Sequence, residues 1–170
     1  MYLYKKSFLY IYNKNMEEKH NKIWGKYTWY LFHTMVEKIK EEYFEEEKNN
    51  LIGQIKNISA NLPCPDCSEH ASKLLNSYKN YHLIKSKENL INFIFEFHSI
   101  VNQKLEKDEF KKEDLKQYKE TDLRKIVVLW NSNFKTVGVN TRMLTDTMRR
   151  NRIKNQFMQY IQNNIRKFES

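Results

Sequence analysis

The sequence predicts an all-α protein, and its composition together with its apolar spacing carries that prediction. Of its 170 residues, 40 % are hydrophobic and 30 % charged, which is enough apolar material for a core and argues against wholesale disorder. Glycine and proline number only 3 and 2. Sheets and barrels need such turn residues at short intervals, so helices joined by short polar loops fit better.

The first sixty residues predict an extension followed by two helices. Residues 1–22 are expected to lie outside the fold. Tyr and Lys interrupt their apolar runs, so we expect neither a membrane span nor a signal peptide. Helical spacing then covers residues 23–39, at Trp24, Tyr27, Leu31, Met35 and Ile39. The acidic run 41–47 is expected to be the solvated end of this helix and a loop, and residues 51–58 a second helix.

Two further helix starts are marked by their own residues. Pro65 suits the first turn of a third helix, expected to run to about Tyr78, because its missing N–H costs nothing there. Ser86 is a candidate N-cap for a fourth helix that ends near Leu105. The charged stretch 107–120 is expected to be a loop or an exposed turn.

A helical C-terminal extension, residues 119–170, is predicted after this bundle. Residues 123–134 are apolar enough for a packed helix, Gly138 breaks it, and residues 141–168 can form a last, strongly basic helix. The net charge of the whole chain is +9. Such a charge favours contact with nucleic acid, an anionic membrane or acidic proteins, or serves solubility alone.

The two cysteines, Cys64 and Cys67, carry the predicted chemistry. Two thiols are too few for a disulfide framework, so their spacing indicates redox chemistry or metal binding. At a helix start they can close a disulfide across the first turn, and the positive end of the helix dipole favours the thiolate that performs disulfide exchange. The alternative is a zinc site in which His70, with His82 or another histidine, completes the ligands.

Two other predicted helices carry paired aromatic, imidazole and amide side chains. Trp29 and His33 are four residues apart in the first, and His98 and Asn102 have the same spacing in the fourth, so each pair shares a helix face. Taken singly, Trp29 is an ordinary core residue, and each histidine is a core histidine with satisfied hydrogen bonds.

Taken together, the three segments resemble the Erv/ALR-type FAD-linked sulfhydryl oxidases. That family shows W-G-x-x-x-W-x-x-x-H on its first helix, C-x-x-C at the start of its third and H-N-x-V-N-x-x-L-x-K on its fourth. The resemblance covers about residues 23–118, and Ser99 replaces the asparagine after the histidine. The matching residues are Trp24, Gly25, Trp29, His33, Cys64, Cys67, His98, Val101, Asn102, Leu105 and Lys107.

The resemblance implies a four-helix bundle with a short fifth helix, holding FAD beside the disulfide. Lys26 and Lys107 would face the cofactor phosphates. Phe110 follows the family's K-x-x-F pattern, whereas Tyr118 fits only with a one-residue gap. The implied cofactor-binding set is Lys26, Trp29, His33, His98, Asn102, Lys107, Phe110 and Tyr118.

A reaction and a setting are implied as well. A substrate thiolate would attack Cys64, Cys67 would lie against the flavin, and O2 would reoxidise the flavin to give H2O2. The chain lacks the shuttle disulfide of cellular members, so a thioredoxin-like or C-x-x-C-bearing partner would reduce the pair directly. Family members are commonly homodimers, and shuttle-less ones are typical of large DNA viruses, which implies a homodimer in host cytoplasm or the virion.

The competing interpretation is a basic nucleic-acid-binding or virion structural protein with a C-x-x-C metal or structural site. Clustered arginine in the last predicted helix supports it, although a solvated basic face is the commoner explanation. Against Asp146 and Glu169, that helix and its end carry Arg142, Arg149, Arg150, Arg152, Lys154, Arg166 and Lys167.

Overall fold

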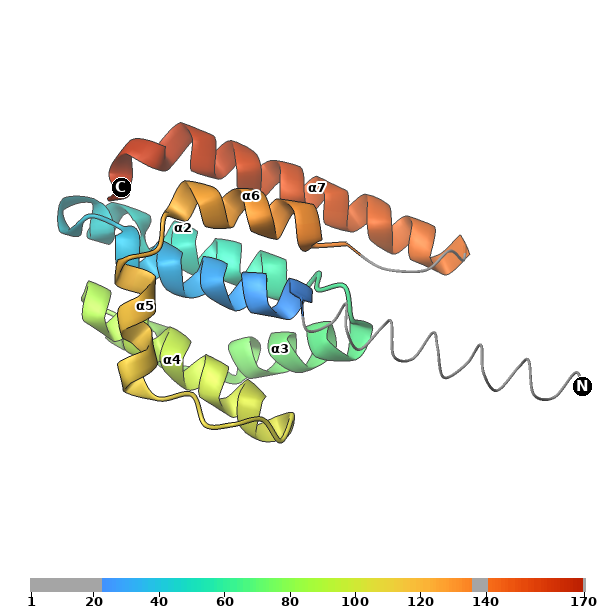
Figure 1. Ribbon diagram of the computed structural model, residues 1–170, viewed down its shortest axis with the longest axis horizontal. Coiled ribbons are helices and arrows are strands. Elements are labelled where there is room, and N and C mark those ends of the chain that lie inside the picture. Colours follow the sequence, from blue (N-terminus) through green and yellow to red (C-terminus); the bar gives the residue numbers. More distant parts are fainter. Residues whose placement is uncertain (1–22, 136–140, 170) are drawn as a thin grey trace, which may run out of the picture.

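The computed structural model describes residues 23–135 and 141–169, and every regular element in these ranges is a helix (Figure 1). The one β-type contact there is an isolated antiparallel bridge between Ile39 and Phe168. The all-α prediction is therefore confirmed. The expected extension over residues 1–22 and the helix break at Gly138 lie outside the described residues.

The described helices follow one another with short connections. The first covers residues 23–38 and is called helix 23–38. The others are α2 (Glu41–Ser59), α3 (Pro65–Ser77), the 3-10 turn η1 (Tyr81–Leu83), α4 (Lys87–Lys104), η2 (Lys112–Leu115), α5 (Lys116–Lys119), α6 (Leu123–Asn133), α7 (Thr141–Asn164) and η3 (Ile165–Lys167).

Local capping explains where several of these helices begin. Pro65 occupies the first turn of α3, as predicted, and Cys64 is its N-cap. The Ser86 hydroxyl accepts a hydrogen bond from the N–H of Asn89, at 3.2 Å, and so caps α4 as predicted. A cap that the sequence analysis missed is Asp122, whose carboxylate accepts from two backbone N–H groups at the start of α6.

The prediction for the acidic run 41–47 is wrong. Helix α2 begins at Glu41, ten residues before the expected start, and includes the whole run. Acidic side chains in its first turn suit the positive end of the helix dipole. Glu47 is also only 2 % exposed and accepts a hydrogen bond from Lys167 Nζ at 2.6 Å. That partner lies 120 residues further on, so local sequence could not reveal it.

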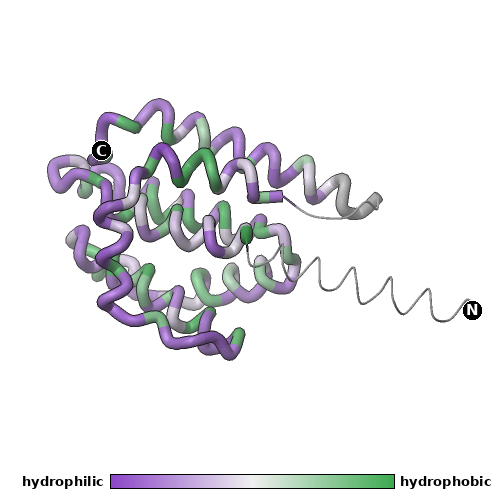
Figure 2. Tube along the Cα trace, viewed as in Figure 1, coloured by the Kyte–Doolittle hydropathy of each residue, from purple (hydrophilic) through white to green (hydrophobic). Residues whose placement is uncertain are grey.

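The charged stretch 107–120 is more ordered than the expected loop. It contains η2 and α5, the short fifth helix, and it buries Phe110 and Tyr118. Figure 2 shows this stretch as mostly hydrophilic, in contrast to the mixed green and purple of the bundle helices. Two aromatic anchors therefore hold an otherwise charged segment on the bundle.

The C-terminal helices share the core of the bundle. Trp130 on α6 and Phe157 on α7 are fully buried and belong to one hydrophobic cluster with residues of helix 23–38, α2 and α4. Figure 1 shows α6 and α7 lying along the side of the bundle. Helix α7 ends at Asn164, four residues before the expected end, and the chain then turns back so that Glu169 donates its N–H to the Lys38 carbonyl at 2.7 Å.

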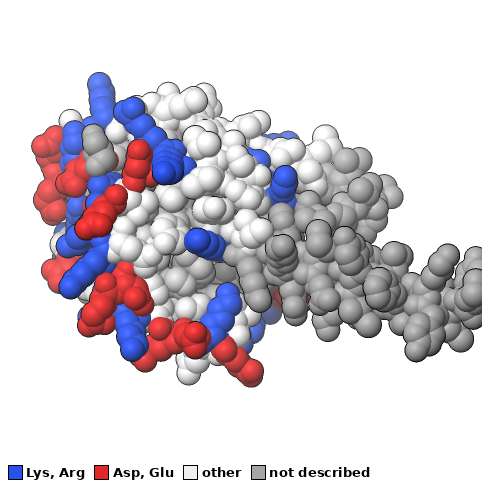
Figure 3. All heavy atoms as spheres, in the orientation of Figure 1, with Lys and Arg blue, Asp and Glu red and all other residues white. Residues whose placement is uncertain are grey.

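Charge is unevenly spread over the surface. Figure 3 shows lysine, arginine and acidic side chains crowded at the end that carries α5 and the C-terminus, with a largely uncharged area in the middle of the same face. Within the described ranges, no helix combines the length and apolar character that crossing a membrane requires.

Candidate active site: a disulfide near a buried ring cluster

Cys64 and Cys67 are joined by a disulfide at the start of α3, with their Cα atoms 5.2 Å apart. The Cys64 sulfur accepts a hydrogen bond from the Cys67 N–H at 3.2 Å. Both side chains are half-buried and pack against the core. A sulfur at this position is stabilised as thiolate by the helix dipole and by the N–H, which is the electrostatic condition for disulfide exchange.

This bond occupies both thiols that the zinc interpretation requires. Among the residues that the structure describes, no group of three or more His, Cys, Asp or Glu side chains is arranged to hold a metal ion. His70 does lie on α3 near the pair, where burial lowers its pKa, and Lys104 and Lys73 lower it further. The redox interpretation of the cysteine pair is therefore favoured over the metal one.

Five side chains from three segments form what we call the ring cluster: Trp29, His33, His98, Phe110 and Tyr118. Trp29 stacks on His98 with ring centroids 4.0 Å apart and an interplanar angle of 12°. His33 stacks on Tyr118 at 4.4 Å and 6°, and Phe110 lies 4.2 Å from His98. The sequence predicted all five for one site, and the structure brings them together.

The two histidines of the ring cluster are held neutral. Burial lowers the pKa of His33 well below its usual value, and His98 lowers it further. Burial also lowers the pKa of His98 to about 4, with a contribution from the Lys107 charge. His33 Nε2 lies 3.0 Å from His98 Nδ1, so one ring donates and the other accepts. A neutral imidazole pair suits a buried site because neither ring carries an uncompensated charge.

One buried nitrogen of the ring cluster has no hydrogen-bond partner among the residues that the structure describes. His33 is 1 % exposed, and its Nδ1 makes no hydrogen bond with the described residues. An unpaired buried nitrogen costs stability, about 1 to 3 kcal/mol. The interpretation of His33, taken singly, as a core histidine with satisfied hydrogen bonds therefore fails at this atom.

The disulfide and the ring cluster lie toward the same end of α4. Lys104, in the last turn of α4, is close enough to act on His70 in the second turn of α3. His98 precedes Lys104 by less than two turns on α4. Cys64, Cys67 and Trp29 also pack against the same hydrophobic core, which supports one region that links the redox pair to the rings.

The remaining predicted site residues lie around the ring cluster rather than in it. Lys26 is exposed, with its ammonium 5.8 Å from the centroid of the Tyr30 ring. Asn102 is half-buried, and its carbonyl accepts from the Lys107 N–H at 3.0 Å. Within the described ranges, no ring contact or hydrogen bond joins the Lys26 or Asn102 side chain to the five rings.

The sequence analysis missed several aromatic neighbours of the ring cluster, and two of them lie against Trp29 and Tyr118. Phe97 meets Trp29 edge-on at 5.2 Å, and Tyr30 meets Tyr118 at 5.3 Å. Each adjoins a predicted residue in sequence, so the available signal was an aromatic beside a motif position. Such a residue points about 100° away on a helix, which is why the i, i+4 pattern excludes it.

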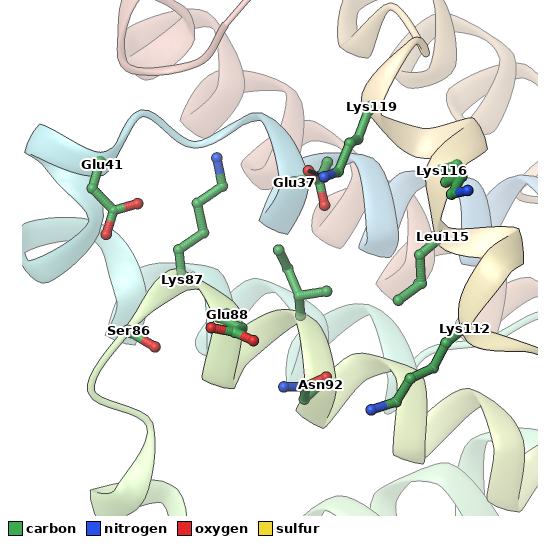
Figure 4. Close-up of a pocket in the computed structure, with 11 residues that line it drawn as sticks. Glu37, Glu41, Ser86, Lys87, Glu88, Asn92, Lys112, Leu115, Lys116 and Lys119 are labelled. Atoms are coloured by element: carbon green, nitrogen blue, oxygen red, sulfur yellow. Dashed lines mark ion pairs between the residues drawn. The ribbon is translucent and has the colours of Figure 1, made fainter.

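A hollow of about 590 Å³ lies elsewhere, between helix 23–38, the start of α4 and the segment of η2 and α5 (Figure 4). Its walls mix acidic and basic side chains, including Glu37, Glu88, Lys112 and Lys116. Ser86 and Lys87 place it at the N-terminal end of α4, away from the disulfide.

The basic C-terminal helix offers less free charge than its sequence indicates. Arg150 is 4 % exposed and Lys167 9 % exposed, and both bond to other parts of the chain. Arg149 is paired with Asp146 at 3.4 Å. Three of the seven cations that supported nucleic-acid binding are thus engaged internally, and that interpretation is not favoured.

A disulfide at a helix start is the arrangement of a protein that performs thiol–disulfide exchange. Residues 26–122 match the model of the Erv1/Alr family, and the chain belongs to that family. This confirms the resemblance drawn from the three motifs. No solved structure matches the chain significantly.

Two relatives are informative. The chain is 29 % identical over 86 residues to the mitochondrial FAD-linked sulfhydryl oxidase erv1 of Schizosaccharomyces pombe, an alignment covering 51 % of this chain and 47 % of that protein. It is 27 % identical over 86 residues to protein 096R of Invertebrate iridescent virus 3, provisionally named an FAD-linked sulfhydryl oxidase, covering 51 % of this chain and 58 % of that one. The chain thus spans about half the length of these relatives.

Proposed function

We propose that this protein is an FAD-dependent thiol oxidase that forms disulfides in partner proteins by exchange at Cys64–Cys67. The observation that carries the proposal is the disulfide at the start of α3, in the same region as the ring cluster. Both relatives are named as FAD-linked sulfhydryl oxidases, which supports the same activity.

The residues present fit a flavin. The unpaired Nδ1 of His33 offers a buried hydrogen-bonding atom, and the half-buried ring of Trp29 keeps part of its surface accessible. Lys26 and Lys107 are exposed cations that suit phosphates. The proposed binding set is Lys26, Trp29, His33, His98, Asn102, Lys107, Phe110 and Tyr118. When bound, FAD would supply the two-electron acceptor that restores the disulfide and passes the electrons to O2 as H2O2.

The chemistry of the chain itself is thiol–disulfide exchange. A substrate thiolate attacks the Cys64 sulfur, the Cys64–Cys67 bond breaks, and Cys67 leaves as a thiolate. A second substrate thiol then attacks the mixed disulfide and releases Cys64. The substrate loses two electrons and two protons, and the pair gains them. The helix start and the Cys67 N–H stabilise the thiolate at Cys64 once it is released.

The absence of other cysteines supports direct reduction by a partner. The sequence has 2 cysteines, and both are in the pair. The electron donor is therefore a thioredoxin-like or other C-x-x-C-bearing protein that reaches Cys64 itself. The family resemblance supports a homodimer, and the iridescent virus relative supports a viral setting in host cytoplasm or the virion.

Oxygen uptake tests this function. Purified protein loaded with FAD is given dithiothreitol, and oxygen consumption and peroxide are measured. Cys64→Ser is expected to lose nearly all thiol-dependent uptake. Ser77→Ala, at the far end of α3, is the matched control and is expected to keep it. Unchanged turnover in Cys64→Ser refutes the assigned role of the pair.

A further inference from the structure

The C-terminal helix contacts the loop that leads into the disulfide. Arg150, on α7, donates a hydrogen bond from Nη1 to the carbonyl of Leu62, at 3.3 Å. Leu62 lies two residues before Cys64 and is 9 % exposed. Arg150 lies outside residues 26–122, the part that matches the family, so this contact comes from the chain's own extension.

Leu62 is held through both of its backbone polar groups. Its N–H donates to the Ser68 hydroxyl at 3.0 Å, and that hydroxyl donates in turn to the Ser59 carbonyl at 3.0 Å. Its carbonyl accepts from Arg150. Ser68 and Ser59 secure the loop from within, whereas Arg150 secures it from a helix 88 residues further along the chain.

The hydrogen bond from Arg150 to Leu62 requires a charged guanidinium to be removed from water. Arg150 is 4 % exposed, and burial of its guanidinium lowers its pKa, while the Asp146 carboxylate opposes that shift and Arg149 adds to it. Arginine still keeps its charge in such a site, so a cation lies on the Leu62 carbonyl, two residues before Cys64. A cation near a cysteine favours thiolate over thiol.

We propose that Arg150 is a positioning residue for the Cys64–Cys67 pair and that the C-terminal helix is thereby part of the redox site. Through Leu62 it fixes the loop that presents Cys64 to a substrate thiolate, and it favours the reduced pair. The inference rests on the proposed function, since it concerns the same disulfide.

The test follows the disulfide itself, without flavin turnover or oxygen. The full-length protein is mixed with dithiothreitol under nitrogen, and free thiols are trapped by alkylation and counted by mass. Each dithiothreitol gives up two electrons and two protons and becomes a cyclic disulfide, and Cys64 and Cys67 become thiols. Rate and equilibrium are compared for wild type, Arg150→Met, Arg150→Lys and the exposed neighbour Arg152→Met.

Arg150→Met is expected to slow the reduction about tenfold and to shift the equilibrium toward the disulfide. Arg150→Lys keeps the charge and is expected to recover most of both, and Arg152→Met is expected to match wild type. Phe157→Leu loosens the packing of α7 without touching Leu62, so it is expected to lower thermal stability and leave the exchange rate unchanged.

Two results overturn the inference. One is exchange in Arg150→Met within twofold of wild type; the other is an equal slowing in Phe157→Leu, which would make the effect one of general stability. The proposed function fails separately, through a wild-type disulfide that dithiothreitol does not reduce.

Discussion

The ring cluster differs in the charge of its side chains from a second polar group, which joins α2 to the C-terminal end of the chain. In the ring cluster, burial lowers the pKa of His33 and His98, and both rings stay neutral. In what we call the clamp, formed by Glu46, Glu47, Tyr160 and Lys167, the charges are kept. Burial alone would raise the pKa of Glu47, but hydrogen bonds from Lys167, Tyr160 and Asn50 lower it below its usual value.

The difference separates the proposed flavin site from a group of side chains whose role is structural. Each charge of the clamp is paired within it: Lys167 Nζ lies 2.6 Å from Glu47 and 2.7 Å from Glu46, and Tyr160 donates to Glu47 at 2.7 Å. Within residues 23–135 and 141–169, His33 Nδ1 of the ring cluster has no hydrogen-bond partner. The clamp, whose charges are paired, holds the end of the chain on α2, whereas the proposed flavin site keeps one nitrogen without a partner from these residues.

The largest effect is expected from breaking the clamp. Lys167→Met leaves the 2 %-exposed Glu47 carboxylate without its cation, and removing one partner of a buried pair costs about 3 kcal/mol. Urea unfolding at neutral pH measures this loss. Lys119→Met removes a more exposed cation, 3.9 Å from Glu37, and should cost less than about 1 kcal/mol. Equal losses in the two variants would contradict the role given to the clamp.

Lowering the pH should reduce the stability contributions of the ring cluster and of the clamp over different pH ranges. His98 has a pKa of about 4 in the fold against 6.5 when exposed, so the unfolded chain binds more protons between these values. Stability therefore falls as the pH drops from 6.5 to about 4, by about 3 kcal/mol for this residue. Glu47, whose folded pKa is lowered, loses its contribution only below its usual value of 4.5.

Free energies of unfolding measured from pH 6.5 to below pH 4 test whether the His98 contribution is lost before that of Glu47. His98→Leu should make the decline between pH 6.5 and 4 shallower by the share of His98, and leave the share of His33 and, at lower pH, that of Glu47. If the variant and the wild type decline in parallel, the buried neutral histidine is not the cause.

Flavin affinity should respond to the ring cluster and not to the clamp. His98→Leu keeps much of the side-chain volume but removes the stacked imidazole and its contact with His33, so FAD binding should weaken about tenfold. Lys167→Met should bind FAD like wild type at a temperature where both are folded. Titration of the apoprotein with FAD, followed by absorbance, measures both. If FAD affinity were weaker in Lys167→Met and unchanged in His98→Leu, the clamp rather than the ring cluster would support flavin binding.

The smallest effect is expected at the edge of the clamp. Tyr160→Phe removes one hydrogen bond to Glu47 and leaves the Lys167 pair in place, which should cost about 1 kcal/mol. Because Tyr160 is partly buried, the phenyl ring retains the packing. Thermal melts of the two proteins show the difference, and a loss as large as that of Lys167→Met would mean that the hydroxyl, rather than the cation, supports Glu47.

The sequence predicted what local signals determine. Pro65 and Ser86 marked helix starts because their effects act within one turn. Trp29 and His98 were placed in one site because helix spacing and the family motifs define them, and the structure stacks their rings. These two helix starts and most of the ring cluster were therefore predictable from local sequence and the family motifs, whereas the start of α2 at Glu41 was not.

Long-range contacts account for the rest. Glu47 was taken for a solvated residue and Arg150 for part of a basic face, because their partners Lys167 and Leu62 lie 120 and 88 residues away. The unpaired Nδ1 of His33 is likewise a property of packing, which no spacing rule reports. Local sequence patterns predict which residue types form a site, but they do not predict which polar atoms lack a hydrogen-bond partner.

The visible spectrum of the purified full-length protein decides whether the ring cluster holds a flavin beside the Cys64–Cys67 disulfide, as we propose. After incubation with FAD and removal of the excess, we expect a retained yellow flavin band that dithiothreitol bleaches under nitrogen in wild type and not in Cys64→Ser. Protein that stays colourless after soaking in excess FAD would contradict it.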